Sequence, residues 1–296
     1  MKKIVTHTTS RFHSDDVFAV ATLDLFFKGD IEIVRTHDPE IIQTGDIVVD
    51  IGKEYDFEKG RFDHHQRGGA GERGNGIQYA SFGLVWKHYG RELAGSDEAS
   101  DLIDKRLVQP VDANDNGQMI FDLKGEVSPY TVQDIMYLFR ENGDDESKDL
   151  LAFKEAVKLA KFILEKEIEN AQRYVEAKKE TLENYSVAED KRVIIFDNEN
   201  FSSDTRAAVL SEFSEPLFVI YPDKGRGSWR AKGVRVGEGF EIRKSLPEEW
   251  GGKYDDDLQS ISGVSDATFC HRGLFTCAAK TKEGVLKMVD LAMNKS

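Results

Sequence analysis

The sequence predicts an α/β protein with a parallel-sheet N-terminal domain (residues 1–146), a long helical connector (147–190) and a smaller α/β C-terminal domain (191–296). Three observations predict this division. Near the N-terminus, short apolar runs surround a segment with helical spacing, an order typical of strand–helix–strand units. The connector is rich in Lys, Glu, Ala and Leu at helical spacing. Strand-like apolar runs return after residue 190.

The N-terminal domain begins with a short buried strand, "KKIVTH" (2–7), in which two β-branched residues precede polar ones. From Ser14 onward apolar residues recur at helical spacing, and Ser14 or Asp15 can cap the first turn of this helix. Two further strands and two further helices follow. We place the strands at 31–37 and 46–52, and the helices at 79–90, stopped by Gly90, and at 97–109, ending at Pro110.

The connector contains no proline, because none occurs between Pro129 and Pro216. Its apolar residues have helical spacing, so we predict either one long helix or two helices broken near Glu167. The C-terminal domain has three strand-like runs and a terminal helix for which Thr281 is the expected N-cap. We place these strands at 192–197, 216–222 and 227–236.

The composition limits the class of partner. The chain has 296 residues and a formal net charge of −14, so no general attraction to nucleic acid or anionic membranes is expected. Metal ions or a few clustered cations would have to draw in an anionic substrate. Cys270 and Cys277 make no disulfide framework, favour a reducing, cytoplasmic setting, and are expected to be packing residues. No apolar run approaches the roughly 20 residues of a membrane span.

Several His and Asp residues stand where the chain leaves a strand or enters a helix. Because ligand sites of α/β sheets lie at the carboxyl ends of the strands, we expect these side chains to gather at one edge. The candidates are His7, His13, Asp15, Asp16, Asp50, Asp63, His64 and His65, and "QPVDANDNG" (109–117) adds Asp112 and Asp115.

A mixture of imidazoles and carboxylates without thiolates suits Mn²⁺, Fe²⁺, Co²⁺ or Zn²⁺ better than a structural zinc site. More than four such ligands indicate two metal ions that share a carboxylate, an arrangement that activates water for attack at phosphorus. Each residue also has a plainer interpretation. Asp15 and Asp16 suit a helix N-terminus, and Asp112 and Asp115 suit a turn. The ordered set as a whole favours the metal site.

These residues resemble the DHH phosphoesterase superfamily. More closely, the strings "THTTSRFHSDDVFAVA", "VVDIG", "GRFDHHQ", "YASFGLVWKHYG" and "VDANDNG" look like the Myg-type subgroup, the melanocyte proliferating gene 1 proteins. The resemblance covers essentially the whole chain. It implies a two-domain DHH phosphoesterase-like fold, two divalent metal ions, usually Mn²⁺, and a smaller C-terminal domain that closes over substrate.

The resemblance also implies residue roles. His65 would face the substrate phosphate, and Asp63 would orient a neighbouring imidazole. The usual superfamily pattern has Asp where His13 stands, and Asp115 competes with Asp112 for one role. One metal would be held by His7, His13 and Asp50, and the other by Asp15, Asp50, His64 and Asp112, with Asp50 bridging.

The C-terminal domain contributes its own candidates. "GRGSWRAKGVR" gathers cations among glycines, and "CHRGLFTCAAK" resembles the substrate loop of DHH-associated domains. Arg and His near glycines can clamp a phosphate or a terminal nucleotide. The alternative is a solvated strand edge protected by Lys and Arg. The expected substrate-binding residues are Arg226, Arg230, His271 and Arg272.

The Myg-type resemblance implies a metal-dependent phosphodiesterase that removes nucleotides from the 3′ end of RNA or short oligonucleotides, a 3′-to-5′ exonuclease. Two other interpretations stay open. One is a small phosphoanhydride or cyclic-dinucleotide hydrolase with the same site, and the other is a non-catalytic metal-binding regulatory protein. The sequence does not fix the oligomeric state, and a homodimer is among the alternatives.

Overall fold

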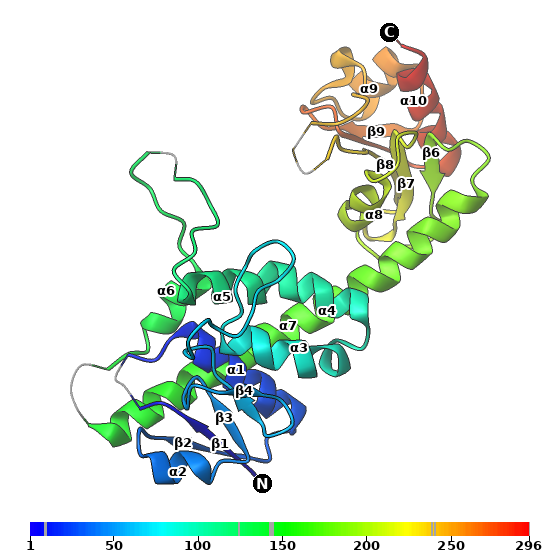
Figure 1. Ribbon diagram of the computed structural model, residues 1–296. Helices are drawn as coiled ribbons and strands as arrows, with labels where there is room; N and C mark the ends of the chain where they lie inside the picture. The colour runs from blue at the N-terminus through cyan, green and yellow to red at the C-terminus, as the bar shows by residue number, and fades with distance from the viewer. Residues whose placement is uncertain (9–10, 124, 142–144, 238, 240, 296) are drawn as a thin grey trace. The chain divides into compact units, whose positions relative to one another are not determined.

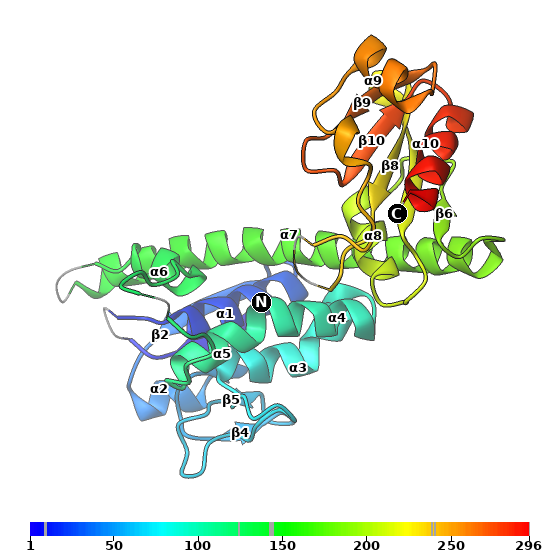
Figure 2. The same ribbon diagram turned by 90° about the horizontal axis from the view of Figure 1, so that it is seen from above.

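The computed structural model describes residues 1–8, 11–123, 125–141, 145–237, 239 and 241–295 (Figures 1 and 2). The chain divides into two compact units, Met1–Gln172 and Arg173–Ser296. Each unit contains a five-stranded mixed sheet accompanied by helices, which confirms the α/β class. Among the described residues, no helix is both long enough and apolar enough to cross a membrane.

The first unit combines its sheet with short helices and with the first part of the long helix α7. Its elements, in chain order, are β1 (Lys2–Thr6), α1 (Ser14–Phe26), β2 (Ile31–Arg35), α2 (Pro39–Gln43), β3 (Ile47–Val49), β4 (Tyr55–Asp56), β5 (Arg61–Phe62), α3 (Ser81–Ala94), α4 (Asp97–Ile103), the π-helix η1 (Asp104–Val108), α5 (Gln109–Asp115), α6 (Val132–Tyr137) and α7 (Glu146–Val187).

The sheet of the first unit has the strand order β2-β1-β3-β5-β4. β2, β1, β3 and β5 run parallel, and β4 is an antiparallel edge strand. α1 and α2 lie on opposite faces of this sheet (Figure 1). Val5 and Val48 pack against Ile42 of α2 on one of those faces. Because the parallel strands point the same way, the residues that follow them share one edge of the sheet.

The second unit contains the end of α7 and a sheet of order β6-β7-β8-β10-β9, in which only β6 and β7 pair in parallel. Its elements are β6 (Val193–Ile195), α8 (Ser203–Leu210), β7 (Phe218–Asp223), the 3₁₀ helix η2 (Lys224–Arg226), β8 (Ser228–Gly233), the 3₁₀ helix η3 (Glu248–Trp250), α9 (Asp255–Ser262), β9 (Ala267–Cys270), β10 (Thr276–Ala279) and α10 (Lys282–Asn294).

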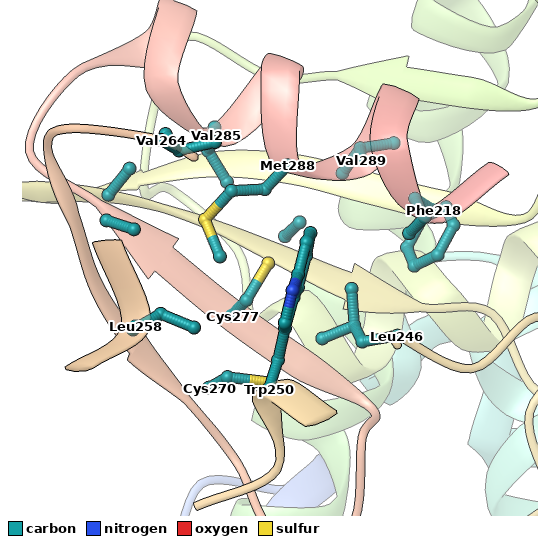
Figure 3. Close-up of a cluster of buried hydrophobic side chains, with 14 of the residues drawn as sticks. Phe218, Leu246, Trp250, Leu258, Val264, Cys270, Cys277, Val285, Met288 and Val289 are labelled. Carbon is teal, nitrogen blue, oxygen red and sulfur yellow. The ribbon is translucent and has the colours of Figure 1, made fainter. Parts of the chain in front are cut away.

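A buried apolar cluster fixes α10 to the sheet of the second unit (Figure 3). Both cysteines belong to this cluster, together with Trp250 and Met288. Neither forms a disulfide, and burial raises the pKa of the Cys270 thiol to about 12. Thr281 caps α10, because its hydroxyl oxygen accepts a hydrogen bond from the Gly284 N–H at 3.0 Å. The predicted packing role and the predicted cap are both confirmed.

Two predicted helix ends are wrong. α3 continues through Gly90 and ends at Ala94, and Gly95 follows as its cap with a φ of 81°, a left-handed conformation. Gly90 is buried inside the helix because Trp86 packs over it, and a Cβ at Gly90 would lie 2.5 Å from the Trp86 ring. Pro110 does not end a helix either. It lies in the first turn of α5, which continues directly from the π-helix η1, so the proline follows a wider π turn within an unbroken helical run.

The connector forms one continuous helix. α7 runs from Glu146 to Val187 without a break at Glu167. This decides between the two arrangements predicted for that segment. The division between the compact units falls within this helix, at Gln172.

Candidate metal centre

The described His and Asp candidates of the first unit come from five places in the chain. His7 follows β1, and Asp50 follows β3. His13 precedes α1, whose first turn carries Asp15 and Asp16, and Asp115 ends α5. Asp63, His64 and His65 follow β5. The parallel strands therefore bring side chains that are distant in sequence to one edge of the sheet.

Asp50 lies between three imidazoles. Its Oδ2 is 3.2 Å from Nε2 of His7, and its Oδ1 is 3.3 Å from Nε2 of His64 and 3.5 Å from Nδ1 of His65. The Ser81 hydroxyl donates a further hydrogen bond to Oδ1 at 3.2 Å. Asp50 has a φ of 59°, a left-handed conformation that Asp tolerates better than most residues. This turn directs the carboxylate toward the imidazoles, where both of its oxygens are in use.

Two further carboxylates complete the cluster. Asp16 Oδ2 is 3.1 Å from Nε2 of His7. Asp115 contacts two imidazoles, since its Oδ2 is 3.1 Å from Nε2 of His64 and its Oδ1 is 3.1 Å from Nδ1 of His13. His13 is thus held by Asp115, and the centre of its ring lies 6.4 Å from that of His7, with both rings lining the same cavity as Asp50.

Asp15 is completely buried, and backbone N–H groups fix its carboxylate. Oδ2 accepts from Ser81 N at 3.1 Å and Oδ1 from Phe82 N at 2.6 Å. Both donors lie at the start of α3, where unpaired N–H groups favour an anion. Burial and neighbouring carboxylates raise the pKa of Asp15 well above its usual value. One face of the cluster is therefore anchored to the backbone of α3.

Among the residues that the structure describes, three groups of side chains could each hold a metal ion, because their ligand atoms lie within 4.8 Å of one another. Asp50 and His64 each belong to two of these groups, so the groups are continuous. The members are His7, Asp16 and Asp50; Asp50, His64 and His65; and Asp15, His64 and Asp115.

The chemistry of the donor set fits divalent metal ions. Asp16 Oδ2 and His64 Nε2 are buried and make no hydrogen bond within the part of the chain that the structure describes. Each nevertheless lies 3.1 Å from an oppositely chargeable atom. Imidazole nitrogens and carboxylate oxygens that lie within 4.8 Å of one another are a donor set that divalent metal ions bind. The mixture of nitrogen and oxygen suits Mn²⁺, Fe²⁺, Co²⁺ or Zn²⁺.

The electrostatics show how strongly the carboxylates act on the imidazoles. Burial would lower the pKa of His7, but Asp16 and Asp50 outweigh it and raise the pKa to about 10. Burial is likewise outweighed at His64, whose pKa Asp115 and Asp50 raise to about 11. Without a metal ion these imidazoles carry protons at neutral pH. A bound cation would take the place of those protons.

Asp63 supports His65. Asp63 Oδ1 lies 2.8 Å from Nδ1 of His65 and accepts the His65 backbone N–H at 3.0 Å, while Oδ2 accepts the Lys53 N–H at 2.5 Å. The contact engages Nδ1 and leaves Nε2 of His65 available. The His65 side chain is 53% exposed, unlike that of His64 at 7%. The two adjacent histidines therefore differ, one buried among carboxylates and one facing solvent.

Asp112 lies outside the three groups. Its Oδ1 accepts the Gly83 N–H at 2.9 Å, and its Oδ2 is 2.8 Å from the guanidinium of Arg73. Arg73 also binds Asp104 through two hydrogen bonds of 2.8 and 3.1 Å. Asp112 thus ties α3 and the loop that carries Arg73 to α5. Asp115, one helical turn later, faces the imidazoles instead.

The structure gives a definite neighbour to Asp16, a sequence candidate without an assigned ligand role, and adds two residues that the sequence did not point to. Asp16 is an immediate neighbour of His7. Because Asp15 and Asp16 are adjacent in the sequence, the sequence does not show which of the two carboxylates faces His7. His37 and Lys53 line a cavity of about 480 Å³ together with His7, Asp50 and His65. His37 follows β2 as His7 follows β1, so the strand-end rule could have found it. Nothing in the sequence singles out Lys53.

In the second unit, Arg226 and Arg230 share one partner. Their guanidinium groups lie 3.0 and 2.9 Å from Oδ2 of Asp223, and Arg230 is 5.4 Å from the centre of the Phe269 ring. Both arginines line a cavity of about 620 Å³. His271 and Arg272 belong to the turn between β9 and β10, outside the lining of this cavity. Nδ1 of His271 accepts the Gly273 N–H at 3.0 Å.

The sequence of this chain matches the family model of the MYG1 exonucleases, described as "Uncharacterised protein family (UPF0160)", over residues 3–293. The chain belongs to the MYG1 family. A MYG1 protein of Dictyostelium discoideum is 30% identical over 327 residues, covering 99% of this chain and 97% of that protein. A MYG1 exonuclease of Homo sapiens is 30% identical over 328 residues, covering 97% and 84%. A MYG1 protein of Chlamydia trachomatis is 28% identical over 298 residues, covering 99% and 97%.

The MYG1 match extends through both compact units. It therefore includes the His and Asp cluster of the first unit as well as the arginine-lined cavity of the second.

Proposed function

We propose that this chain is a metal-dependent 3′-to-5′ exonuclease that hydrolyses phosphodiester bonds in RNA or short oligonucleotides. The observation that carries the proposal is the position of Asp50, whose two oxygens face the imidazoles of different candidate metal groups. A carboxylate in that position suits a two-metal site of the kind expected in the DHH phosphoesterase superfamily. Relatives of this chain from rat, human and mouse are named MYG1 exonuclease.

The ligand sets follow from the contacts of the cluster. His7, Asp16 and Asp50 would hold one ion, with Asp16 in the place that the resemblance gives to His13. The other ion would be held by Asp15, His64 and Asp115, with Asp50 adjacent and Asp115 in the place of Asp112. Two divalent ions, for which Mn²⁺ is our choice, would polarise the scissile phosphate and lower the pKa of the attacking water.

The side chains around the ions bind and orient the substrate. His65 reaches the cavity beside the cluster, and Asp63 holds its Nδ1 so that Nε2 can donate a hydrogen bond to a phosphate oxygen. Because the imidazole ring of His65 is already held in one orientation, substrate binding loses less conformational entropy. In the second unit, Arg226, Arg230, His271 and Arg272 stay as the proposed contacts to the nucleotide chain.

The decisive experiment is a matrix of metals and substrates. Purified protein is assayed with Mn²⁺, Co²⁺, Zn²⁺ and Mg²⁺ on 5′-labelled and 3′-labelled oligoribonucleotides, matched oligodeoxynucleotides, pyrophosphate and a cyclic dinucleotide. A 5′-labelled RNA should shorten one nucleotide at a time, and a 3′-labelled RNA should release labelled mononucleotide first. Faster turnover of pyrophosphate or the cyclic dinucleotide would move the substrate to the small-molecule class. If no substrate is hydrolysed with any metal, the proposed activity is refuted and a non-catalytic metal-binding protein is the remaining alternative.

Two variants tie the activity to the site. Asp50→Asn removes a charge from the centre, and we expect a loss on the order of 10³-fold or more, equivalent to the several kcal/mol that metal ions supply. Asp56→Asn is the matched control, since Asp56 is on β4 and pairs with Lys59. Equal activity of both variants would show that the cluster is not the active site.

A further inference from the structure

The cavity beside the metal centre contains two permanent cations. It has a volume of about 480 Å³, and Arg11 and Lys53 line it together with His7, Asp50 and His65. Arg11 belongs to the segment between β1 and α1, whereas Lys53 follows β3. Two separate segments therefore bring a guanidinium and an ammonium to one cavity in a chain whose net charge is −14.

The backbone around Lys53 is constrained. Asp50, Gly52 and Lys53 have φ values of 59°, 98° and 55°, so the chain after β3 follows a tight left-handed path. The Lys53 N–H donates to Asp63, the same carboxylate that holds His65. The base of the lysine is thereby fixed relative to His65. A non-glycine residue in this conformation is uncommon and costs about 1–2 kcal/mol, so the contacts around the turn hold Lys53 in place.

Both cations are exposed and available for a ligand. Within the described ranges, neither the Arg11 guanidinium nor the Lys53 ammonium makes a hydrogen bond or an ion pair. Arg61, which lies two residues before Asp63, differs from Arg11 because its guanidinium makes hydrogen bonds to the protein. Its guanidinium donates to the carbonyl oxygens of Gly45, Lys59 and Gly60 and so braces a turn. Arg61 therefore stabilises the fold, whereas Arg11 lines the cavity.

From these observations we infer that Arg11 and Lys53 form a subsite for a second, non-scissile phosphate of the substrate. The inference rests on the proposed function, in which the scissile phosphate lies at the metal centre. Because the two cations line the same cavity as His7, Asp50 and His65, a substrate bound at the centre brings its neighbouring phosphate to them. The substrate class is then a nucleotide chain with at least two phosphates, and a dinucleotide joined by a single phosphate binds more weakly.

The test compares ligands that differ only in a terminal phosphate. The ligands are the dinucleotide ApA, its 5′-phosphorylated form and its 3′-phosphorylated form. The first measurement is KM and kcat with Mn²⁺. The second is the Kd of matched dinucleotides with a non-hydrolysable methylene-phosphonate linkage, measured by calorimetry with and without Mn²⁺. One of the two phosphorylated forms should bind about tenfold or more tightly than ApA, as expected for charge-assisted hydrogen bonds.

The variants isolate the charge from the fold. Lys53→Gly removes the ammonium at a backbone position that glycine adopts readily, so folding should survive. Lys28→Gly is the matched control, because Lys28 is exposed, has a φ of 54° and does not line the cavity. Lys53→Gly and Arg11→Gln should each reduce the preference for the terminal phosphate about tenfold. Lys53→Arg and Lys28→Gly should retain it.

The outcomes are distinguishable. If the unsubstituted protein shows no preference, or if Lys53→Gly and Arg11→Gln keep it, the subsite is refuted even when the protein cleaves RNA. Equal weakening of all three ligands also refutes it, because cations that only balance the acidic cluster would act on every substrate alike. If no dinucleotide is cleaved but the Kd preference exists and is lost in the two variants, the subsite stands and the proposed function fails.

Discussion

Separate substitutions of Asp112 and Asp115 by Asn should have different effects, one mainly on the stability of the fold and the other mainly on metal affinity. The sequence gives these two aspartates almost equal claims as ligands. In the structure, Asp115 contacts His64 and His13, whereas Asp112 contacts Arg73 and the Gly83 N–H. We therefore expect Asp115→Asn to weaken metal binding and Asp112→Asn to weaken the fold.

The cost of Asp112→Asn can be bounded from its contacts. Removing one partner of a buried ion pair costs roughly 3–5 kcal/mol. Asn keeps the oxygen that accepts the Gly83 N–H, and Arg73 keeps Asp104. In addition, burial raises the pKa of Asp112 to about 7 against the opposing effect of Arg73, so ionisation of this carboxyl is itself costly. We expect a loss of about 2 kcal/mol, which lowers Tm by roughly 4–8 °C for a unit of this size.

Asp115→Asn should act on the metal. Replacing residues that merely orient metal ligands weakens affinity roughly 10–100-fold, so loss of a ligand should cost about 100-fold or more. Asp115→Asn should also lower the stability of the metal-free fold, because the contacts of Asp115 to His13 and His64 outweigh its burial and its repulsion from Asp50 and hold its pKa below the usual value.

The assay is calorimetric titration of each metal-free variant with Mn²⁺, combined with thermal unfolding. If Asp112→Asn loses metal affinity while Asp115→Asn retains it, the ligand assignment is wrong. Equal losses in both variants would show that the ion-pair network and the metal site cannot be separated in this way.

Three further predictions concern the scaffold. Gly90→Ala should lower stability by about 1–3 kcal/mol in denaturant titration although Ala favours helices, because the new methyl meets the Trp86 ring; an unchanged midpoint would contradict this packing. Cys270 and Cys277 should resist alkylation at pH 8 in the native protein and react after unfolding, since burial raises the pKa of both thiols; rapid native labelling would show an open core. Arg206→Met should lower the Tm of the second unit, because the fully buried guanidinium of Arg206 forms an ion pair with Glu180 of α7. An unaltered Tm would show that this ion pair contributes nothing to stability.

Six of the ten described strands, together with α1, α3, α7 and α10, could be read from local pattern because each depends on side chains close in sequence. The strands β4, β5, β9 and β10 and the helices α2, α6, α8 and α9 were not predicted. β-branched runs such as that around Ile4 and Val5 form strands, and the apolar spacing after Ser14 forms α1. The two wrong helix ends occurred where a contact or a neighbouring turn overrides the local propensity of glycine or proline. Gly90 is inside a helix where Trp86 covers it, and Pro110 lies within a helical run that continues from α4 through the π-helix η1 into α5.

The sequence by itself determined the α/β class, the chemical nature of the candidate centre and the strand ends from which its side chains come. Parallel strands gather their carboxyl ends whatever the details of packing, so the approximate place of the cluster follows from element order. Only the tertiary structure decided which of two nearby carboxylates faces the imidazoles. A helical turn separates Asp112 from Asp115, and the positions of Arg73 and His64, both distant in sequence, assign one to the fold and the other to the cluster.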